Sequence, residues 1–203
     1  MTDFGHLGLF AEQGPNWRWI QEQIEVARRP IHVLNTFAYT GGSSLAAAAA
    51  GANVVHLDAA KGINLWAREN AQASGLDERP IHWITDDVVK FVDREIRRGK
   101  HYDGLILDPP SFGRGPKGQV WKLEKDLPEL LDVCRQLLSQ KPRFILLSAH
   151  TPGFSPIALE NLLADMTRSY QGRLSSMEMV IPQSDSNRYL PSGIMARWSG
   201  VEE

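Results

Sequence analysis

This sequence is poor in cysteine, in long apolar runs and in excess charge of either sign. Its one cysteine, Cys134, excludes an internal disulfide framework and a metal site built from several cysteines. No apolar stretch approaches the roughly 20 residues that a membrane-spanning helix needs, so we expect no such helix. The first residues, 1–5, lack a basic segment followed by an apolar one, so we expect no secretory signal and a cytoplasmic protein.

The charge is nearly balanced, with 22 Lys and Arg against 24 Asp and Glu, which gives a net charge of -2. Proteins that bind nucleic acid unaided are more often basic. A nucleic-acid substrate would therefore need a local basic patch or a partner domain outside these residues. The histidines are scattered without the spacing of metal ligands, so we expect no metal site.

Apolar runs alternate with helix-prone segments along the 203 residues, which suffice for a single domain, 1–203. Helices are expected at 43–50, 61–74, 88–98, 127–138 and 156–170. Strands are expected at 31–35, 53–57, 80–85, 102–107, 143–148, 174–181 and 194–198. The pattern predicts an α/β fold, a Rossmann-like, mainly parallel seven-stranded sheet with helices on both faces and a C-terminal antiparallel hairpin. Residues 1–29 form an N-terminal arm ahead of the first strand.

Ligands of such sheets bind beyond the carboxyl ends of the strands, so the residues that follow each strand are the candidate site. Gly41 and Gly42 follow the first strand and would let a ligand approach the backbone closely. Asp58 ends the second strand and could accept hydrogen bonds from a ribose diol. Asp86 and Asp87 follow the third strand and could accept from an adenine amine. Each feature also has an ordinary interpretation, as a plain turn or as a cap of the next helix.

The fourth strand is followed by the segment Asp108-Pro109-Pro110-Ser111-Phe112. Its two prolines lack backbone N–H groups and stiffen the chain, so this segment cannot continue the sheet. They hold a carboxylate, the Pro109 carbonyl and an aromatic ring in fixed places. Such features at four successive strand ends, in order, favour a ligand site over a chance arrangement.

The ligand is best explained as an adenosine without phosphates. The chain has no Gly-x-Gly-x-x-Gly segment, which a nicotinamide cofactor usually requires around its pyrophosphate. It also lacks the Gly-x-x-x-x-Gly-Lys-Ser/Thr segment of a nucleotidase. S-adenosylmethionine has adenine and ribose but no phosphate, so it fits better.

Five segments, taken in order, resemble the motifs of one known family: 7–13, 35–42, Asp58 with 67–70, Asp86-Asp87 and 108–112. On these segments the chain is similar to class I S-adenosylmethionine-dependent methyltransferases. Among these it most resembles the bacterial large-subunit ribosomal-RNA methyltransferase family. The first-strand loop and the Asp-Pro-Pro-Ser-Phe segment are specific together, and the other motifs are generic to the class.

This resemblance implies an S-adenosyl-L-methionine site and an RNA substrate. The arm and the first loop would contact the methionine end of the cofactor, through Glu12, Gln13, Thr36, Phe37, Tyr39, Gly41 and Gly42. The ribose would contact Asp58, the adenine would contact Asp86 or Asp87, and Asp108 would lie beside the cofactor.

Two features depart from that family. These residues hold no separate RNA-binding domain. The fifth strand ends at residues 147–150, Leu-Ser-Ala-His, where relatives that methylate carbon 5 of cytosine place a nucleophilic cysteine. Cys134, in a helix among leucines, is expected in the core. We therefore reject carbon-5 chemistry for this chain.

Catalysis is expected to rest on alignment, with Asp108, Pro109 and Phe112 as the catalytic residues. Asp108 and the Pro109 carbonyl would aim the acceptor nitrogen of a planar base, extruded from its helix, and Phe112 would stack on it. His150 could serve as a base, and the basic, glycine-rich segment 113–122 could clamp a phosphate backbone or be a solvated loop.

The leading hypothesis is an RNA-base methyltransferase that works without a cysteine nucleophile. One alternative is a methyltransferase that acts on a small molecule or a protein side chain, which the acidic pI of about 6.3 and the lack of a separate RNA-binding domain favour. Another is a cofactor-binding scaffold without catalysis, which the Asp-Pro-Pro-Ser-Phe segment argues against. The oligomeric state stays open.

Overall fold

The computed structural model describes residues 8–114 and 120–201, and its centre is a seven-stranded sheet with the order β3-β2-β1-β4-β7-β9-β8. Five strands run parallel: β1 (His32–Thr36), β2 (Asn53–Asp58), β3 (Ile81–Thr85), β4 (Gly104–Leu107) and β7 (Phe144–Ala149). The hairpin of β8 (Gly172–Pro182) and β9 (Tyr189–Gly200) joins β7 antiparallel. The predicted fold class is confirmed, hairpin included.

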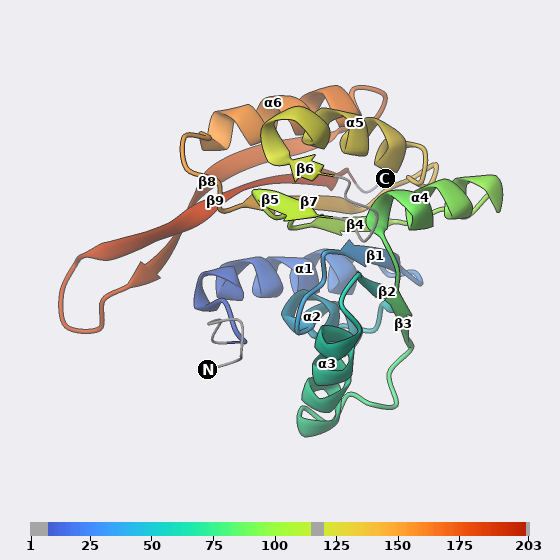
Figure 1. Cartoon of the computed structure of the whole chain (residues 1–203), viewed down its shortest axis with the longest axis horizontal. Coiled ribbons are helices and arrows are strands. Elements are labelled where there is room, and N and C mark those ends of the chain that lie inside the picture. The colour runs from blue at the N-terminus through green and yellow to red at the C-terminus, as the bar shows by residue number, and fades with distance from the viewer. Residues whose placement is uncertain (1–7, 115–119, 202–203) are drawn as a thin grey trace.

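Helices cover both faces of the sheet (Figure 1). One face carries α1 (Gly14–Val26), α2 (Gly42–Ala49) and α3 (Lys61–Ala73), and the other carries α4 (Val88–Arg97), α5 (Leu123–Arg135) and α6 (Pro156–Thr167). Residues of β1 alternate between two apolar cores, with Val33 on the α1 and α2 side and Leu34 on the opposite side. Both side chains are fully buried, as a strand covered on each face requires.

The N-terminal arm holds more regular structure than its sequence suggests. A 3-10 turn, η1 (Ala11–Gln13), leads directly into the 13-residue helix α1, which has a proline in its first turn. The buried side of α1 consists of Asn16, Ile20 and Ile24, so an amide stands where apolar periodicity would expect a hydrophobic side chain. The helix packs against α2 and places the residues just before it at the carboxyl edge of the sheet.

Two segments of the second half of the chain also differ from the expectation. A short antiparallel ladder joins β5 (Phe112–Arg114) and β6 (Val120–Lys122) within the segment expected to be a loop. The middle of that segment, with Lys117, lies outside the described residues. The C-terminal hairpin is longer than predicted, and beyond the pairing of Ala149 with Ile194 its two strands continue as a ribbon away from the sheet (Figure 1).

Candidate cofactor and methyl-transfer site

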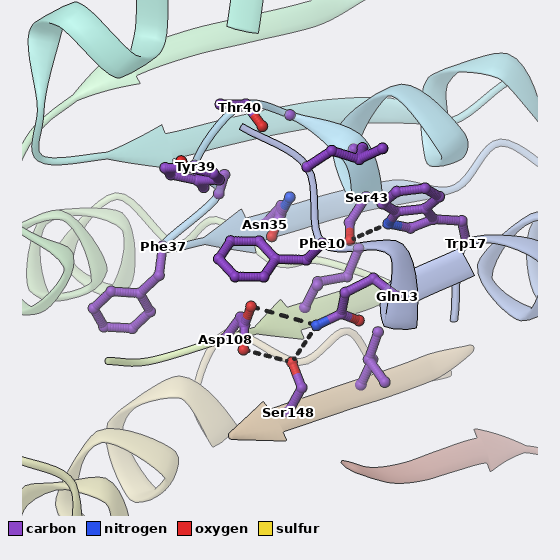
Figure 2. Close-up of a pocket in the computed structure, with 16 residues that line it drawn as sticks. Phe10, Gln13, Trp17, Asn35, Phe37, Tyr39, Thr40, Ser43, Asp108 and Ser148 are labelled. Carbon is purple, nitrogen blue, oxygen red and sulfur yellow. Dashed lines mark hydrogen bonds between the residues drawn. The ribbon is translucent and has the colours of Figure 1, made fainter. Parts of the chain in front are cut away.

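A pocket lies where the arm meets the carboxyl ends of β1, β4 and β7 (Figure 2). It is lined by Leu9, Phe10, Gln13, Trp17, Asn35, Phe37, Ala38, Tyr39, Thr40, Gly41, Gly42, Ser43, Ile106, Asp108, Leu146 and Ser148. Six of the predicted site residues are thus brought together: Gln13, Phe37, Tyr39, Gly41, Gly42 and Asp108.

The loop after β1 has an unusual backbone. Phe37, Tyr39 and Gly41 have φ angles of 55°, 49° and 95°, so three of five consecutive residues are left-handed. In residues other than glycine this conformation costs roughly 1–3 kcal/mol each and persists only where neighbours impose it. The backbone N–H of Tyr39 donates to Asp58 Oδ2 at 2.9 Å, and that of Ala38 donates to the Leu57 carbonyl at 3.1 Å. The end of β2 therefore imposes the loop conformation that shapes the pocket.

Asp58 borders this loop without lining the pocket itself. Its two carboxylate oxygens each accept one backbone hydrogen bond, from Tyr39 and from Ala60, both at 2.9 Å. A carboxylate oxygen has two lone pairs, so each oxygen of Asp58 retains capacity for a further donor such as a ribose hydroxyl. The contact of Asp58 with the ribose stays a prediction. The structure shows in addition that Asp58 holds the loop after β1.

The other predicted adenine and methionine contacts have partners within the protein. Asp87 caps α4 by accepting from the Lys90 backbone N–H at 3.1 Å, which is the capping interpretation. Asp86 pairs with Arg94 at 2.7 Å. Burial alone would raise the pKa of Asp86, but the Arg94 hydrogen bond helps to bring that pKa below its ordinary value. The buried Thr36 hydroxyl donates to the Ile106 carbonyl. None of the three lines the pocket described above.

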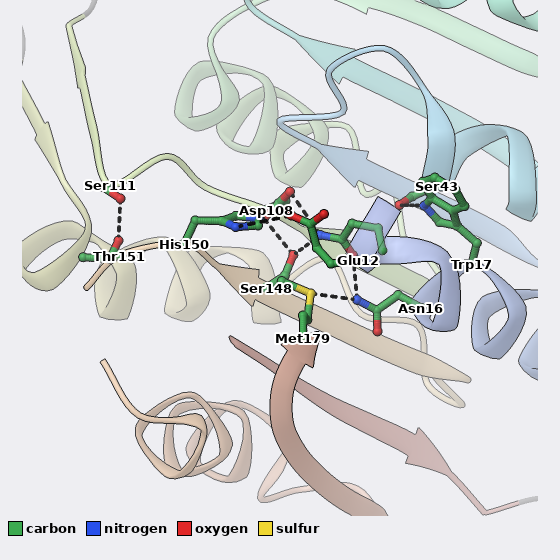
Figure 3. A network of polar contacts seen from close by, with 11 residues as sticks. Glu12, Asn16, Trp17, Ser43, Asp108, Ser111, Ser148, His150, Thr151 and Met179 are labelled. Carbon is green, nitrogen blue, oxygen red and sulfur yellow. Dashed lines mark hydrogen bonds and ion pairs between the residues drawn. The ribbon is translucent and has the colours of Figure 1, made fainter. Parts of the chain in front are cut away.

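Asp108 lies at the centre of a polar cluster (Figure 3). Ser148 Oγ donates to its Oδ1 at 2.7 Å, and Gln13 Nε2 reaches its Oδ2 at 3.4 Å and Ser148 Oγ at 3.2 Å. His150 Nε2 lies 3.8 Å from Asp108 Oδ1, and its Nδ1 lies 3.9 Å from Glu12 Oε1. Glu12, also a predicted site residue, is therefore linked to the cluster through the imidazole and is not among the residues that line the pocket.

Burial raises the pKa of the Asp108 carboxyl above its ordinary value. The nearby His150 and the Ser148 hydrogen bond act against this shift, and the Glu12 carboxylate adds to it. A carboxyl whose pKa is higher in the folded than in the unfolded state binds more protons when folded, so stability falls as pH rises from its ordinary pKa through the raised one. Above that window the folded protein carries the full penalty of the charged carboxylate, and below the ordinary pKa it carries none.

Asp108→Ala is therefore expected to gain stability relative to the parent as the pH rises through that window. The measurement is urea unfolding of both proteins at a series of pH values between about 4 and 8. The difference in unfolding free energy, variant minus parent, should increase with pH and then level off. A difference independent of pH would contradict the raised pKa.

The predicted stacking ring differs in position from the ring that lines the pocket. Phe112, on β5, is 51% exposed and lies outside this pocket, whereas Phe37 lines it. The Phe37 and Trp121 rings are 6.0 Å apart, and Trp121 Nε1 donates to the Pro110 carbonyl at 2.7 Å. Pro109 is buried beside Asp108. The roles of Pro109 and Phe112 in catalysis remain predictions.

Among the residues in or beside this site that sequence reasoning did not assign to it are Ser148, Asn16 and Trp17. Ser148 drew attention only as part of the segment where relatives have a cysteine, and no pattern in the sequence of the arm distinguished Asn16. Trp17 lines the pocket and donates from Nε1 to Ser43 Oγ at 3.2 Å. The one available signal was the position of Ser148 at the end of a fully buried strand.

The chemistry of the pocket wall suits a cation without phosphates. Among the described lining residues none is Lys or Arg, the groups that would hold a pyrophosphate. Aromatic rings and one carboxylate face the pocket instead (Figure 2). Both are favourable neighbours for a positively charged sulfonium. The residues present therefore fit S-adenosylmethionine better than a dinucleotide.

The sequence profile of the S-adenosylmethionine-dependent methyltransferase family matches residues 3–161, and the chain belongs to this family. Its cofactor is S-adenosylmethionine. Ribosomal RNA large subunit methyltransferase I of Aeromonas salmonicida is 29% identical over 184 residues, 89% of this chain and 45% of that protein. Ribosomal RNA large subunit methyltransferase K/L of Hahella chejuensis is 30% identical over 141 residues, 68% of this chain and 18% of that protein. The chain thus spans less than half of these relatives.

A solved S-adenosylmethionine-dependent methyltransferase from Agrobacterium tumefaciens is 43% identical and has a TM-score of 0.91, over 98% of this chain and 65% of that one. Magnesium protoporphyrin IX methyltransferase of Synechocystis, solved with its bound cofactor, is 14% identical with a TM-score of 0.63, over 98% of this chain and 86% of that one, and shows a shared fold alone. Within the described parts of the chain, no helix is long and apolar enough to cross a membrane.

Proposed function

We propose that this chain transfers the methyl group of S-adenosylmethionine to a base nitrogen of RNA, with ribosomal RNA as the substrate. The observation that carries the proposal is the Asp108 carboxylate, oriented by Ser148 and Gln13 at the edge of a pocket without cations. The large-subunit methyltransferases to which the chain is similar support RNA as the acceptor.

The residues that would hold the cofactor are those assigned from the sequence. Gln13, Phe37, Tyr39, Gly41 and Gly42 face the pocket and would bind the methionine end, with Glu12 and Thr36 behind them. Asp58 would bind the ribose, and the segment of Asp86 and Asp87 would bind the adenine. The cofactor supplies an activated methyl group on sulfur, with a neutral leaving group.

The protein then has to orient the acceptor and remove a proton. The Asp108 carboxylate and the Pro109 carbonyl would accept hydrogen bonds from the acceptor amine and orient its lone pair for methyl transfer. An acceptor nitrogen that gains a methyl group must lose a proton, and Asp108 would accept it. Its raised pKa favours this role, and His150, whose Nε2 lies 3.8 Å from Asp108 Oδ1, would pass the proton on.

A cysteine-dependent mechanism has no support from the described residues. Cys134 is 1% exposed in the core between helices, and burial raises the pKa of its thiol to about 12. A buried thiol of this kind is inert, because the thiolate is the nucleophile. At the end of β7 the hydroxyl of Ser148 is engaged with Asp108. Nitrogen chemistry, which needs no covalent intermediate, is therefore the better hypothesis.

The test follows radiolabelled methyl groups from S-adenosylmethionine into cell fractions from a strain that lacks this gene. The fractions are assembled large ribosomal subunits, free RNA, protein and small metabolites. Incorporation into ribosomal RNA, released by nuclease as a methylated base, is the expected result. Incorporation into protein or metabolites alone would overturn the RNA assignment and favour the alternative acceptor that the net charge of -2 suggests.

A further inference from the structure

A chain of buried and partly buried hydrogen bonds connects the C-terminal hairpin to Asp108. Arg197 of β9 donates to Asn16 Oδ1 from Nη2 at 2.5 Å and from Nε at 3.1 Å. Asn16 Nδ2 donates to Gln13 Oε1 at 2.6 Å, and Gln13 Nε2 donates to Asp108 Oδ2 and to Ser148 Oγ. The two amide residues are 1% and 6% exposed, so water has little access to them.

The two ends of this hydrogen-bond chain dictate how the amides of Asn16 and Gln13 are oriented. A guanidinium only donates hydrogen bonds, so the oxygen of Asn16 must face Arg197 and its NH₂ group must face Gln13. The oxygen of Gln13 then faces Asn16, and its NH₂ group faces Asp108. An ionised carboxylate only accepts, so this is the one amide orientation that satisfies it. The reverse orientation of Gln13 would place an amide oxygen against a carboxylate oxygen.

Other contacts hold the Arg197 guanidinium in place. Its guanidinium lies over the Trp19 ring, 4.9 Å from the centroid, and is buried enough that its pKa falls to about 10, with Glu22 opposing the shift. Asn16 Nδ2 also approaches Met179 Sδ of β8 at 3.3 Å (Figure 3). The hairpin thus supplies one end of a hydrogen-bond chain whose other end is the Asp108 carboxylate.

We propose that Arg197 and Asn16 are positioning residues that act on Asp108 through the amide of Gln13. They direct the Gln13 NH₂ group at the carboxylate, which favours its charged form and orients its oxygens toward the acceptor. Other charged groups face Asp108 as well, namely Glu12 of η1 and His150 after β7, and Ser148 of β7 donates to it. This inference rests on the proposed role of Asp108.

Asn16→Asp removes the hydrogen-bond donor at position 16 but keeps the size and shape of the side chain. An aspartate still accepts from Arg197 but cannot donate to Gln13, whose amide loses the partner that orients it. We expect kcat to fall about tenfold or more, equivalent to roughly 1.4 kcal/mol, with KM for S-adenosylmethionine within about threefold of the parent. The acid limb of the pH–rate profile should move to higher pH, because the carboxylate loses a donor.

A second pair of variants, at Arg197, separates the orientation of the Gln13 amide from the packing of side chains around it. It also keeps the test open if Asn16→Asp does not fold. Arg197→Met removes the donor and should lower kcat in the same way. Arg197→Lys keeps a donor and a charge and should retain most of the parent's kcat. Asn161→Asp, an exposed position on α6, adds the same charge as Asn16→Asp away from the site and should change neither value. Equal activity of the Met and Lys variants would overturn the proposal.

One readout needs no methyl acceptor. In protein with ¹³C-labelled aspartate, with the Asp108 signal assigned from Asp108→Asn, the carboxyl titration should move to higher pH in Asn16→Asp and in Arg197→Met. If it moves and no fraction accepts methyl groups, the hydrogen-bond chain stands and the proposed function fails. If methyl transfer occurs and neither the titration nor kcat changes, the positioning role is wrong.

Discussion

Asp108→Ala is expected to lower the rate of methyl transfer by about 10²–10⁴-fold, the usual contribution of a positioned acid or base. The affinity for S-adenosylhomocysteine should change little, because the pocket wall contributed by the arm and the β1 loop is intact. The rate is measured as label transferred into the accepting fraction, and the affinity is measured by calorimetry.

The matched control is Asp93→Ala, which removes an exposed carboxylate from α4. It should leave both rate and affinity unchanged. Should Asp108→Ala retain the parent's turnover, the acceptor-positioning role of this residue is wrong, whatever the substrate. A large loss of S-adenosylhomocysteine affinity would instead place the carboxylate in cofactor binding.

The parts of the fold that sequence predicted well are those in which every residue of a segment obeys one rule. All six residues of β7 are buried, and the four residues of β4 are buried too, so continuous apolar runs identify them as central parallel strands. The helix α4 has an Asp87 cap and buries Val88, Phe91 and Val92 at helical spacing. Local signals and tertiary environment agree in these elements, so their boundaries differ by only a residue or two.

The parts that sequence could not predict depend on contacts between distant residues. Helix α1 buries Asn16 because Arg197, 181 positions later, satisfies its oxygen. No local pattern reveals that a buried amide will find such a partner. The ladder of β5 and β6 is similar: it is only three residues long on each side, and Trp121 anchors it through the Pro110 carbonyl.

The candidate site shows the same division. The carboxyl-end rule for parallel sheets was enough to identify Tyr39, Gly41 and Asp108 as neighbours, because it depends only on topology. It did not decide between a ligand contact and a helix cap for Asp87, which caps α4, and it did not show that Phe112, on β5, would lie outside the pocket that Phe37 lines. Those outcomes depend on backbone angles and on which side chain a turn points inward.

Gly42→Ala is expected to weaken binding of S-adenosylhomocysteine about tenfold or more, or roughly 1.4 kcal/mol. A Cβ at position 42 would lie 2.6 Å and 2.9 Å from two atoms of the Trp17 ring, closer than real contacts allow. The indole cannot remain in place, because this overlap is with rigid ring atoms and overpacking costs about 1–3 kcal/mol. Its displacement would disturb the Trp17 bond to Ser43 and the pocket wall that both residues form.

The clash can be separated from a general effect on the helix. Gly62→Ala, at the start of α3, meets nothing within 4 Å and should bind S-adenosylhomocysteine as the parent does. A double-mutant cycle with Trp17→Leu then tests the cause. If the indole is the obstacle, the double variant should bind no more weakly than Trp17→Leu alone, because the smaller side chain leaves room for the new methyl group. Additive losses in the cycle would show that Gly42 acts through the ligand or the backbone and that the Trp17 contact is incidental.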